Sequence, residues 1–217
     1  MAKLDNEQIQ FIDNYLENSE VFYADIRMEM VDHVASAIEA RIENGDKRDF
    51  YYIFKDYMIE NKYRLLNDNK QFLKDVDKGI LKRLFVLLTK PQAIIAFALL
   101  VFVSHKYMEI NGHAGLVSVF FWFPFMSIVP FMILYFMMLK LFKLSRFSGV
   151  ERLAFVYMFF FEFLNLLRIL FRSNFNSETS NHLIISVVGS VMILIPAVLL
   201  QLTYHIMNNY RKKYRTI

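Results

Sequence analysis

An acidic and imidazole motif near the N-terminus has the residue types for chemistry. Glu29, Asp32 and His33 lie three and four positions apart, so a helix places them on one face. A carboxylate beside an imidazole can orient the ring or help to hold a metal. Zinc needs further ligands, and the four other histidines all lie beyond residue 100. With Glu39 further along, the motif favours a partner-binding or structural role over a metal or catalytic one. We predict no metal, cofactor or catalytic residue.

A second polar group lies inside an apolar stretch. Glu162, Asn165 and Arg168 follow each other every third residue, which makes a polar strip on a Phe- and Leu-rich helix. One interpretation is an intramembrane site, either a proton or ion relay with Glu162 as carrier or a ligand pocket. The structural alternative, which we favour, has Glu162 and Asn165 hydrogen-bonded to neighbouring helices and Arg168 reaching toward the interface.

The first 89 residues have the periodicity of amphipathic helices. Asp5 can cap a first helix in a capping box with Gln8. A second helix is predicted over 22–44, where Asn44-Gly45 provides the stop. A third is expected after a cap at Asp49, and a separate fourth from about residue 72. Their expected apolar faces are Ile9, Ile12 and Leu16; Ile26, Met30, Val34, Ile38 and Ile42; Phe50, Ile53, Phe54 and Tyr57; and Phe72, Val76, Ile80, Leu84 and Leu87.

Beyond residue 90 the pattern becomes continuously apolar. Stretches near 91–110, 115–139, 152–172 and 183–206 are long enough to cross a hydrocarbon layer of roughly 30 Å. Pro91 suits the first position of its helix, whereas Pro124, Pro130 and Pro196 lie inside helices and favour bends. Ser186, Gly189 and Ser190 form a small-residue patch that favours close helix contact.

Composition and charge agree with this division. Of 217 residues, 56% are hydrophobic and 17% aromatic, which exceeds the level of an ordinary soluble domain. Residues 1–89 hold 13 basic and 17 acidic side chains, whereas residues 90–217 hold 12 and 4. The excess of positive charge therefore belongs to the apolar part and does not indicate nucleic-acid binding. The absence of cysteine excludes disulfides, Fe–S clusters and thiol catalysis.

The basic residues predict an orientation. Thirteen lysines and arginines flank the spans on one side and two on the other. By the positive-inside rule, we expect a multi-pass protein of the bacterial inner (cytoplasmic) membrane with both termini in the cytoplasm. At the C-terminal end, the side chains expected to anchor the topology on lipid headgroups are Arg211, Lys212, Lys213 and Arg215.

The stretch from Glu29 through Asp32-His33 to Glu39, followed by Asn44-Gly45 and an aromatic helix beginning at Phe50, resembles the HAAS-type signalling domain. The resemblance covers roughly residues 4–65. It implies a short helical cytoplasmic module of sensors or regulators, often working with PadR-like transcription factors, and it implies no catalytic residue. Ile53 stands where that pattern favours alanine.

We therefore predict an all-α protein with a cytoplasmic helical domain over 1–89 and a four-helix transmembrane bundle over 90–217. We expect a non-enzymatic signalling, regulatory or scaffold subunit that contacts membrane lipids and a cytoplasmic or membrane protein partner, and that forms homo-oligomers. The alternative function is a small transporter or ion-coupled component that uses Glu162. A membrane enzyme acting on lipid is the weakest hypothesis, because its His and Glu residues are scattered and form no constellation. The sequence holds no Walker loop, dinucleotide fingerprint or hydrolase elbow, which disfavours ordinary soluble-enzyme chemistry.

Overall fold

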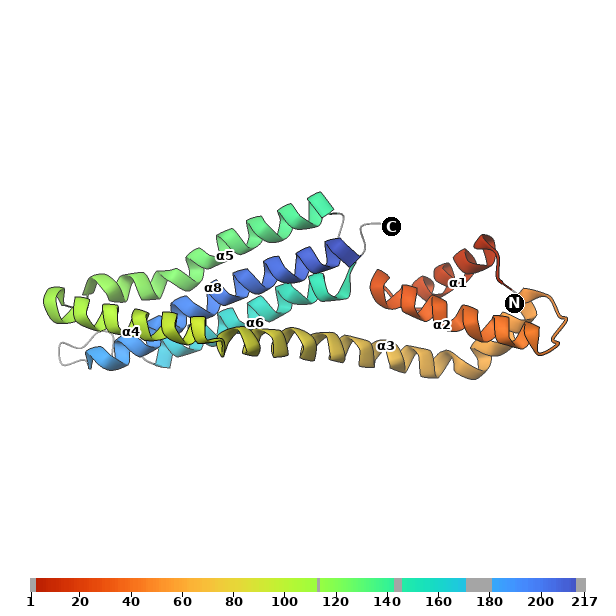
Figure 1. Cartoon of the computed structure of the whole chain (residues 1–217), viewed down its shortest axis with the longest axis horizontal. Coiled ribbons are helices and arrows are strands. Elements are labelled where there is room, and N and C mark those ends of the chain that lie inside the picture. The colour runs from red at the N-terminus through yellow and green to blue at the C-terminus, as the bar shows by residue number, and fades with distance from the viewer. Residues whose placement is uncertain (1–2, 113, 143–145, 171–180, 214–217) are drawn as a thin grey trace. The chain divides into compact units, whose positions relative to one another are not determined.

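A computed structural model of the chain describes residues 3–112, 114–142, 146–170 and 181–213. These residues form helices and no strand, which confirms the all-α prediction (Figure 1). The chain divides into two compact units. The front unit comprises residues 1–78 with 146–149, and the bundle unit comprises residues 79–145 with 150–217. The sequence placed the division at residue 89, whereas the compact units divide inside a helix.

The first helix begins at its predicted cap, and the second begins two residues after its predicted start and stops at the predicted signal. Helix α1 (Asn6–Asn18) carries the predicted capping box, in which the Asp5 carboxylate accepts from the Gln8 N–H at 2.8 Å and the Gln8 side chain accepts from the Asp5 N–H at 3.0 Å. Helix α2 (Ala24–Glu43) has Asn44 as its C-cap. Gly45 follows with φ +98°, a conformation that glycine adopts without the steric cost of a Cβ atom.

Helix α3 (Phe50–Leu88) corrects one prediction. We expected two helices in this region, but the structure has one continuous helix of 39 residues. No glycine or proline lies between Tyr57 and Phe72. The weaker helix formers Asn67, Asp68 and Asn69 each cost at most about 0.7 kcal/mol relative to alanine, too little to end a helix whose flanks are already formed.

The front unit buries the predicted apolar stripes in one core. Ile12 of α1, Val34 of α2 and Ile53 of α3 are completely inaccessible to solvent, and the other residues of the first three predicted stripes are buried or packed against them. Of the fourth predicted stripe, Phe72 packs against this core, whereas Ile80 and Leu84 are buried in the bundle unit. Phe11 meets Phe54 edge to face, with ring centroids 5.2 Å apart. The core therefore forms as the periodicity predicts.

An ion-pair network closes the turn between α2 and α3. Arg48 donates to the carboxylates of Asp46 and Asp56 at 2.7–3.0 Å. The hydrogen bonds from Arg48 hold the pKa of the Asp46 carboxyl below its ordinary value of 3.8. Because the folded pKa is lowered, this contact stabilises the turn above that ordinary value and is lost as the pH falls through the lowered pKa.

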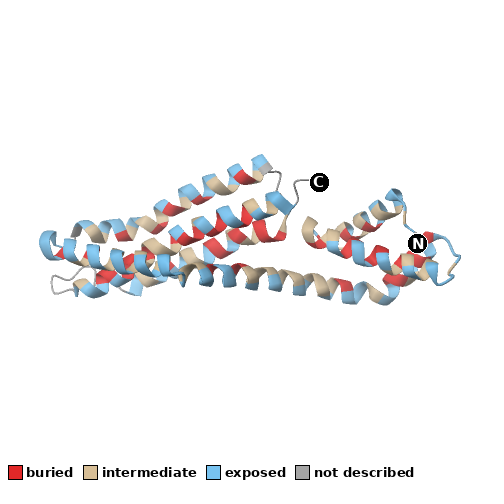
Figure 2. Ribbon diagram, viewed as in Figure 1, coloured by how far each residue is buried: buried red, intermediate tan, exposed pale blue. Residues whose placement is uncertain are grey.

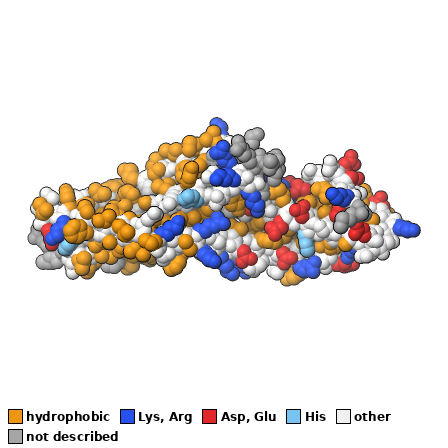
Figure 3. All heavy atoms as spheres, in the orientation of Figure 1, with side chains coloured by type: hydrophobic (Ala, Val, Ile, Leu, Met, Phe, Trp, Pro, Cys, Tyr) orange, Lys and Arg blue, Asp and Glu red, His pale blue; other side chains and the backbone are white. Residues whose placement is uncertain are grey.

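Among the described residues, four helices are long and apolar enough to cross a membrane: α4 (Pro91–Asn111), α5 (Ala114–Phe142), α6 (Ser148–Leu170) and α8 (His182–Lys213). All four predicted spans are thus found, although residues 171 and 172 of the third lie outside the described residues. On the face drawn in Figure 3, hydrophobic side chains cover most of the surface of α4 and α5. Pro91 opens α4, as predicted.

Helix α8 is the most buried of the four spans (Figure 2). It packs against both α4 and α5, and its small residues face a large aromatic ring. Ser186 and Ser190 are completely buried, and the backbone at Gly189 lies directly against the side chain of Phe120. The predicted small-residue patch is therefore a helix contact.

A polar contact joins α5 to α6 in the otherwise apolar bundle. The Tyr157 hydroxyl donates to the Ser127 carbonyl oxygen and also lies 2.9 Å from the Ser127 Oγ. The Ser127 hydroxyl in turn donates to the carbonyl oxygen of Pro124, one turn earlier. The rings of Tyr157 and Phe131 stack with centroids 3.8 Å apart. Side-chain hydroxyls thus donate to backbone carbonyls in the part of α5 that lies between its two prolines, Pro124 and Pro130.

The first prediction concerns the contact between Gly189 and Phe120. A Cβ atom at position 189 would overlap the Phe120 ring, so we expect Gly189→Ala to destabilise the bundle by about 1–3 kcal/mol. The measurement is unfolding of the purified protein in detergent. Gly115→Ala is the matched control, because the nearest atom to its new methyl group is the Tyr107 hydroxyl at 3.9 Å, an ordinary contact. Equal stability of the two variants would contradict the assignment of Gly189 as a packing site.

Candidate functional site

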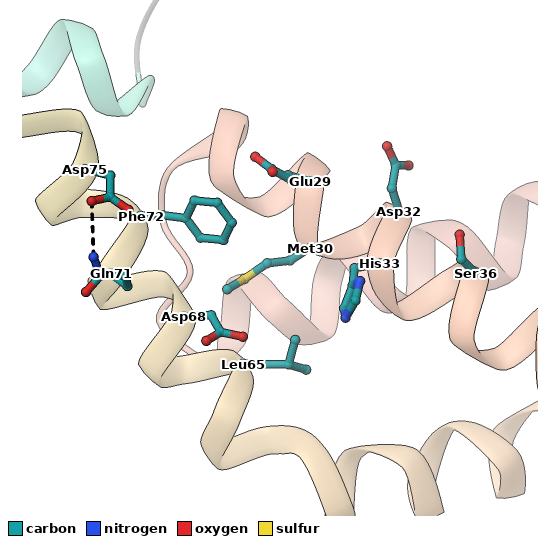
Figure 4. Close-up of a pocket in the computed structure, with 10 residues that line it drawn as sticks. All are labelled: Glu29, Met30, Asp32, His33, Ser36, Leu65, Asp68, Gln71, Phe72 and Asp75. Carbon is teal, nitrogen blue, oxygen red and sulfur yellow. Dashed lines mark hydrogen bonds between the residues drawn. The ribbon is translucent and has the colours of Figure 1, made fainter. Parts of the chain in front are cut away.

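The front unit contains a cavity of about 480 Å³ between α2 and α3 (Figure 4). Its volume is in the range of small-ligand and peptide side-chain pockets. Both helices contribute an apolar part and a charged part to its wall. The lining residues are Glu29, Met30, Asp32, His33 and Ser36 from α2, and Leu65, Asp68, Gln71, Phe72 and Asp75 from α3.

The α2 wall is the motif that the sequence analysis selected. Glu29, Asp32 and His33 all line the cavity and are exposed, because they flank the buried side of α2 that carries Met30. In Figure 4, Met30 and His33 extend from α2 toward α3, whereas Asp32 points away from it. The motif therefore presents its imidazole to the cavity and one carboxylate to the rim.

The α3 wall was not predicted as part of a site. Leu65, Asp68, Phe72 and Asp75 are spaced by three and four residues, so they share one side of the helix. Sequence reasoning treated Phe72 only as the start of an apolar stripe. These residues were missed because the sequence predicted two helices here. Helix α3 is continuous, and its continuity places these residues beside α2.

The cavity is acidic around an apolar floor. Four carboxylates and one imidazole line it together with Met30, Leu65 and Phe72, and no lysine or arginine does. Among the described residues, Glu29, Asp32 and Asp68 make no ion pair. Asp75 accepts a hydrogen bond from Gln71 at 3.1 Å and lies 3.9 Å from the Lys78 ammonium. The uncompensated negative charge favours a cationic group next to an apolar one.

The walls of the cavity hold groups that can bind a ligand. In the part of the chain that the structure describes, no group of three or more His, Asp or Glu side chains is placed to hold a metal ion. No hydrogen bond between described residues joins His33 to a carboxylate or to a hydroxyl that it would activate. The cavity provides a concave surface, an apolar floor and four carboxylates that can accept hydrogen bonds.

Glu39 lies outside the cavity and has a different contact. Its carboxylate accepts a hydrogen bond from the Leu4 N–H at 3.0 Å, which ties the segment before α1 to α2. The side chain is half-buried, and Leu4 packs against the core of the front unit. Of the four residues that the sequence analysis grouped, three line the cavity and Glu39 makes a contact within the fold.

The intramembrane strip on α6 is arranged differently from either interpretation. Glu162 is exposed on the surface of the helix, and neither it nor Asn165 makes a hydrogen bond among the described residues. The Arg168 guanidinium lies over the rings of Phe121 and Phe125 of α5, at 5.8 and 5.1 Å from their centroids. The strip therefore does not form one connected site.

The basic residues at the end of α8 lie where the sequence places them. Arg211, Lys212 and Lys213 are exposed in its last turn, where positive charge also complements the helix dipole. Arg215 lies outside the described residues.

One contact of the front unit had no signal in the sequence. Residues 146–149, which lead into α6, belong to this unit. The Ser148 N–H and hydroxyl both donate to the Asp25 carboxylate, at 2.9 and 2.6 Å, so a side chain of α2 caps the start of α6. Arg146 pairs with Glu17 of α1 at 2.7 Å. The partners are more than 120 residues apart, a separation that no local pattern reports.

Models of known protein families, curated proteins and solved structures were each compared with this chain, and none matches it. The geometry of the cavity is therefore the basis for any functional assignment. The resemblance of residues 4–65 to the HAAS-type signalling domain stays a prediction.

Proposed function

We propose that this chain is a non-enzymatic integral membrane protein whose front unit docks a basic segment of a partner protein, which makes the chain a regulatory or scaffold subunit. The observation that carries the proposal is the acidic cavity with an apolar floor between α2 and α3. Such a cavity selects for positive charge at its rim and for an apolar side chain inside.

The chemistry of the cavity indicates the form of the partner. An amphipathic helix can insert an apolar anchor between Met30 and Leu65 while lysines or arginines one turn away reach Glu29, Asp68 or Asp75. Three of the four carboxylates are exposed and Asp68 is half-buried, so each contributes modestly. The expected complex is weak, salt-sensitive and reversible, as suits a regulatory contact.

The proposed location is the bacterial inner membrane, with the front unit and both termini in the cytoplasm. The support for this orientation is the ratio of thirteen basic residues to two on the flanks of the spans. The HAAS-type resemblance, which implies a cytoplasmic sensor or regulator module, agrees with a docking function for the same residues.

A second candidate function is that of an ion-coupled membrane component using Glu162. The specific observation in its favour is an acidic side chain exposed on the apolar surface of α6, with no ion pair among the described residues. Such a group is costly against lipid, so it requires a function or a partner. We favour docking because Arg168 contacts aromatic rings rather than Glu162.

The docking proposal predicts charge-dependent peptide binding. For the full chain in detergent, we expect an amphipathic Leu/Lys helix of about 18 residues to bind, and a Leu/Glu helix of equal length not to bind. Asp68→Asn with Asp75→Asn should weaken binding of the Leu/Lys helix about tenfold. The measurement is fluorescence anisotropy of labelled peptide at two salt concentrations.

The matched control is Glu7→Gln with Glu20→Gln, which makes the same change of charge at exposed positions of the front unit outside the cavity. It should leave the affinity unchanged. If both double variants lost affinity equally, attraction to the overall charge of the unit would explain the binding, and the cavity would not be the docking site. A photo-crosslinker at Ser36, on the cavity wall, should label the peptide more than one at Tyr63, which is 89% exposed elsewhere on α3.

A separate experiment distinguishes the two candidate functions. The docking proposal predicts that proteoliposomes of the purified chain show no proton flux above empty liposomes under an imposed pH gradient. Flux that disappears in Glu162→Gln, but persists in Asn165→Ala, would instead establish the ion-coupled function. The readout is an entrapped pH-sensitive dye, and helical content by circular dichroism verifies that both variants are folded.

A further inference from the structure

The bundle unit contains a second cavity, of about 500 Å³, between the last part of α3 and the last part of α8. Its walls combine apolar side chains with basic and amide groups. The residues that line it are Gly79, Lys82, Arg83, Val86, Leu87 and Lys90 before the first span, and Leu202, His205, Ile206 and Asn209 of α8.

The polar part of this cavity is basic. Lys82, Arg83 and Lys90 bring three cationic groups to it, and no acidic side chain lines it. Among the described residues none of the three makes an ion pair. His205 and Asn209 are one turn apart on α8 and offer further hydrogen-bonding groups on the opposite wall. This combination suits a phosphate group, which arginine binds through two parallel hydrogen bonds and lysine as a point charge.

An apolar groove continues from the basic cavity. A space of about 230 Å³ shares Leu87 and Lys90 with it and runs between α4 and α8. Alanines give the groove its width, because Ala93 and Ala96 of α4 lie opposite Ala197 of α8. The remaining lining residues are Gln92, Leu194, Val198 and Gln201.

The basic cavity lies at the ends of candidate spans, and the groove lies between two of these spans. Lys90 directly precedes Pro91, the first residue of a candidate span. Helix α8 has 32 residues, which at 1.5 Å per residue gives about 48 Å, longer than the roughly 30 Å of a hydrocarbon layer. Its apolar run ends before Gln201, and His205 and Asn209 follow. Both walls therefore change from apolar to polar at the same end of the bundle.

We infer that these two connected spaces form a binding site for one anionic glycerophospholipid. Lys82, Arg83 and Lys90 hold its phosphate, and the alanine-lined groove between α4 and α8 holds an acyl chain. The groove distinguishes a lipid from a soluble phosphate compound, which would use only the basic part. Basic pockets beside membrane-spanning helices are a recurrent form of headgroup recognition, and the acyl chain adds apolar contact.

The experiment measures binding of phosphatidylglycerol and phosphatidylcholine to the full-length, delipidated chain in detergent by native mass spectrometry. We expect the chain to bind one phosphatidylglycerol at least tenfold more tightly than phosphatidylcholine. Replacing all three cationic residues, Lys82→Gln, Arg83→Gln and Lys90→Gln, should remove this preference. The matched control is Arg64→Gln, Lys70→Gln and Lys74→Gln, an equal change of charge on exposed positions of α3 outside the site.

A second pair of variants tests the groove. Ala197→Phe fills it from an exposed position and should weaken binding of both lipids, whereas Ala98→Phe, exposed on α4 outside the groove, should not. Glycerol 3-phosphate at millimolar concentration should fail to displace the lipid. Persistence of the headgroup preference after loss of the three cations, equal effects of the two phenylalanine variants, or efficient displacement by glycerol 3-phosphate would each overturn the assignment.

Discussion

The bundle unit depends on one constraint, which is that a backbone in hydrocarbon has to satisfy its own hydrogen bonds. Helices meet this constraint because their backbone hydrogen bonds form within each helix. In α5 the Ser127 hydroxyl also donates to the Pro124 carbonyl oxygen, and the Tyr157 hydroxyl of α6 donates to the Ser127 carbonyl oxygen. Contacts between these helices then rest on shape, because lipid is as apolar as their side chains. The fit of the Phe120 ring against Gly189 is of this kind.

The front unit follows the rules of a water-soluble protein, because its helices are apolar on one side only. Helices α1 and α2 and the first half of α3 bury a single core of aliphatic and aromatic side chains. Helix α3 continues along that core as far as Phe72 and Leu73, and this stretch places Asp68 and Phe72 opposite the Glu29 to Ser36 segment of α2. The cavity therefore lies beside the core, because Leu65 and Phe72 contribute to both.

Both cavities combine apolar side chains with charged ones, which are acidic in the front unit and basic in the bundle unit. In each, an apolar surface favours burial of a nonpolar group, and unpaired charges at the edge select the sign of the ligand. The acidic cavity lies in the front unit, whose helices are amphipathic. The basic cavity lies in the bundle unit, near the start of α4 and the end of α8. The docking site that we propose for a protein segment and the site that we propose for a lipid thus belong to separate units.

Local patterns in the sequence predicted most of the fold. The capping box at Asp5, the stop at Gly45, the start at Pro91 and the four apolar stretches each depend on residues within a few positions of one another, so a linear reading finds them. The same reading placed a break between Tyr57 and Phe72 that does not exist. The helix propensities of the residues in that stretch favour a break by only a small free energy, and packing outweighs it.

The candidate site could be predicted only in part. Glu29, Asp32 and His33 were found because they share one helix face, whereas Asp68 and Asp75 were not, since their role depends on which face α3 turns toward α2. By itself the sequence determined the helical class, the number of candidate spans and the sign of charge in each half. Only the tertiary structure decided which carboxylates share a cavity and which cations border a groove, because side chains more than 30 residues apart meet through packing rather than through periodicity.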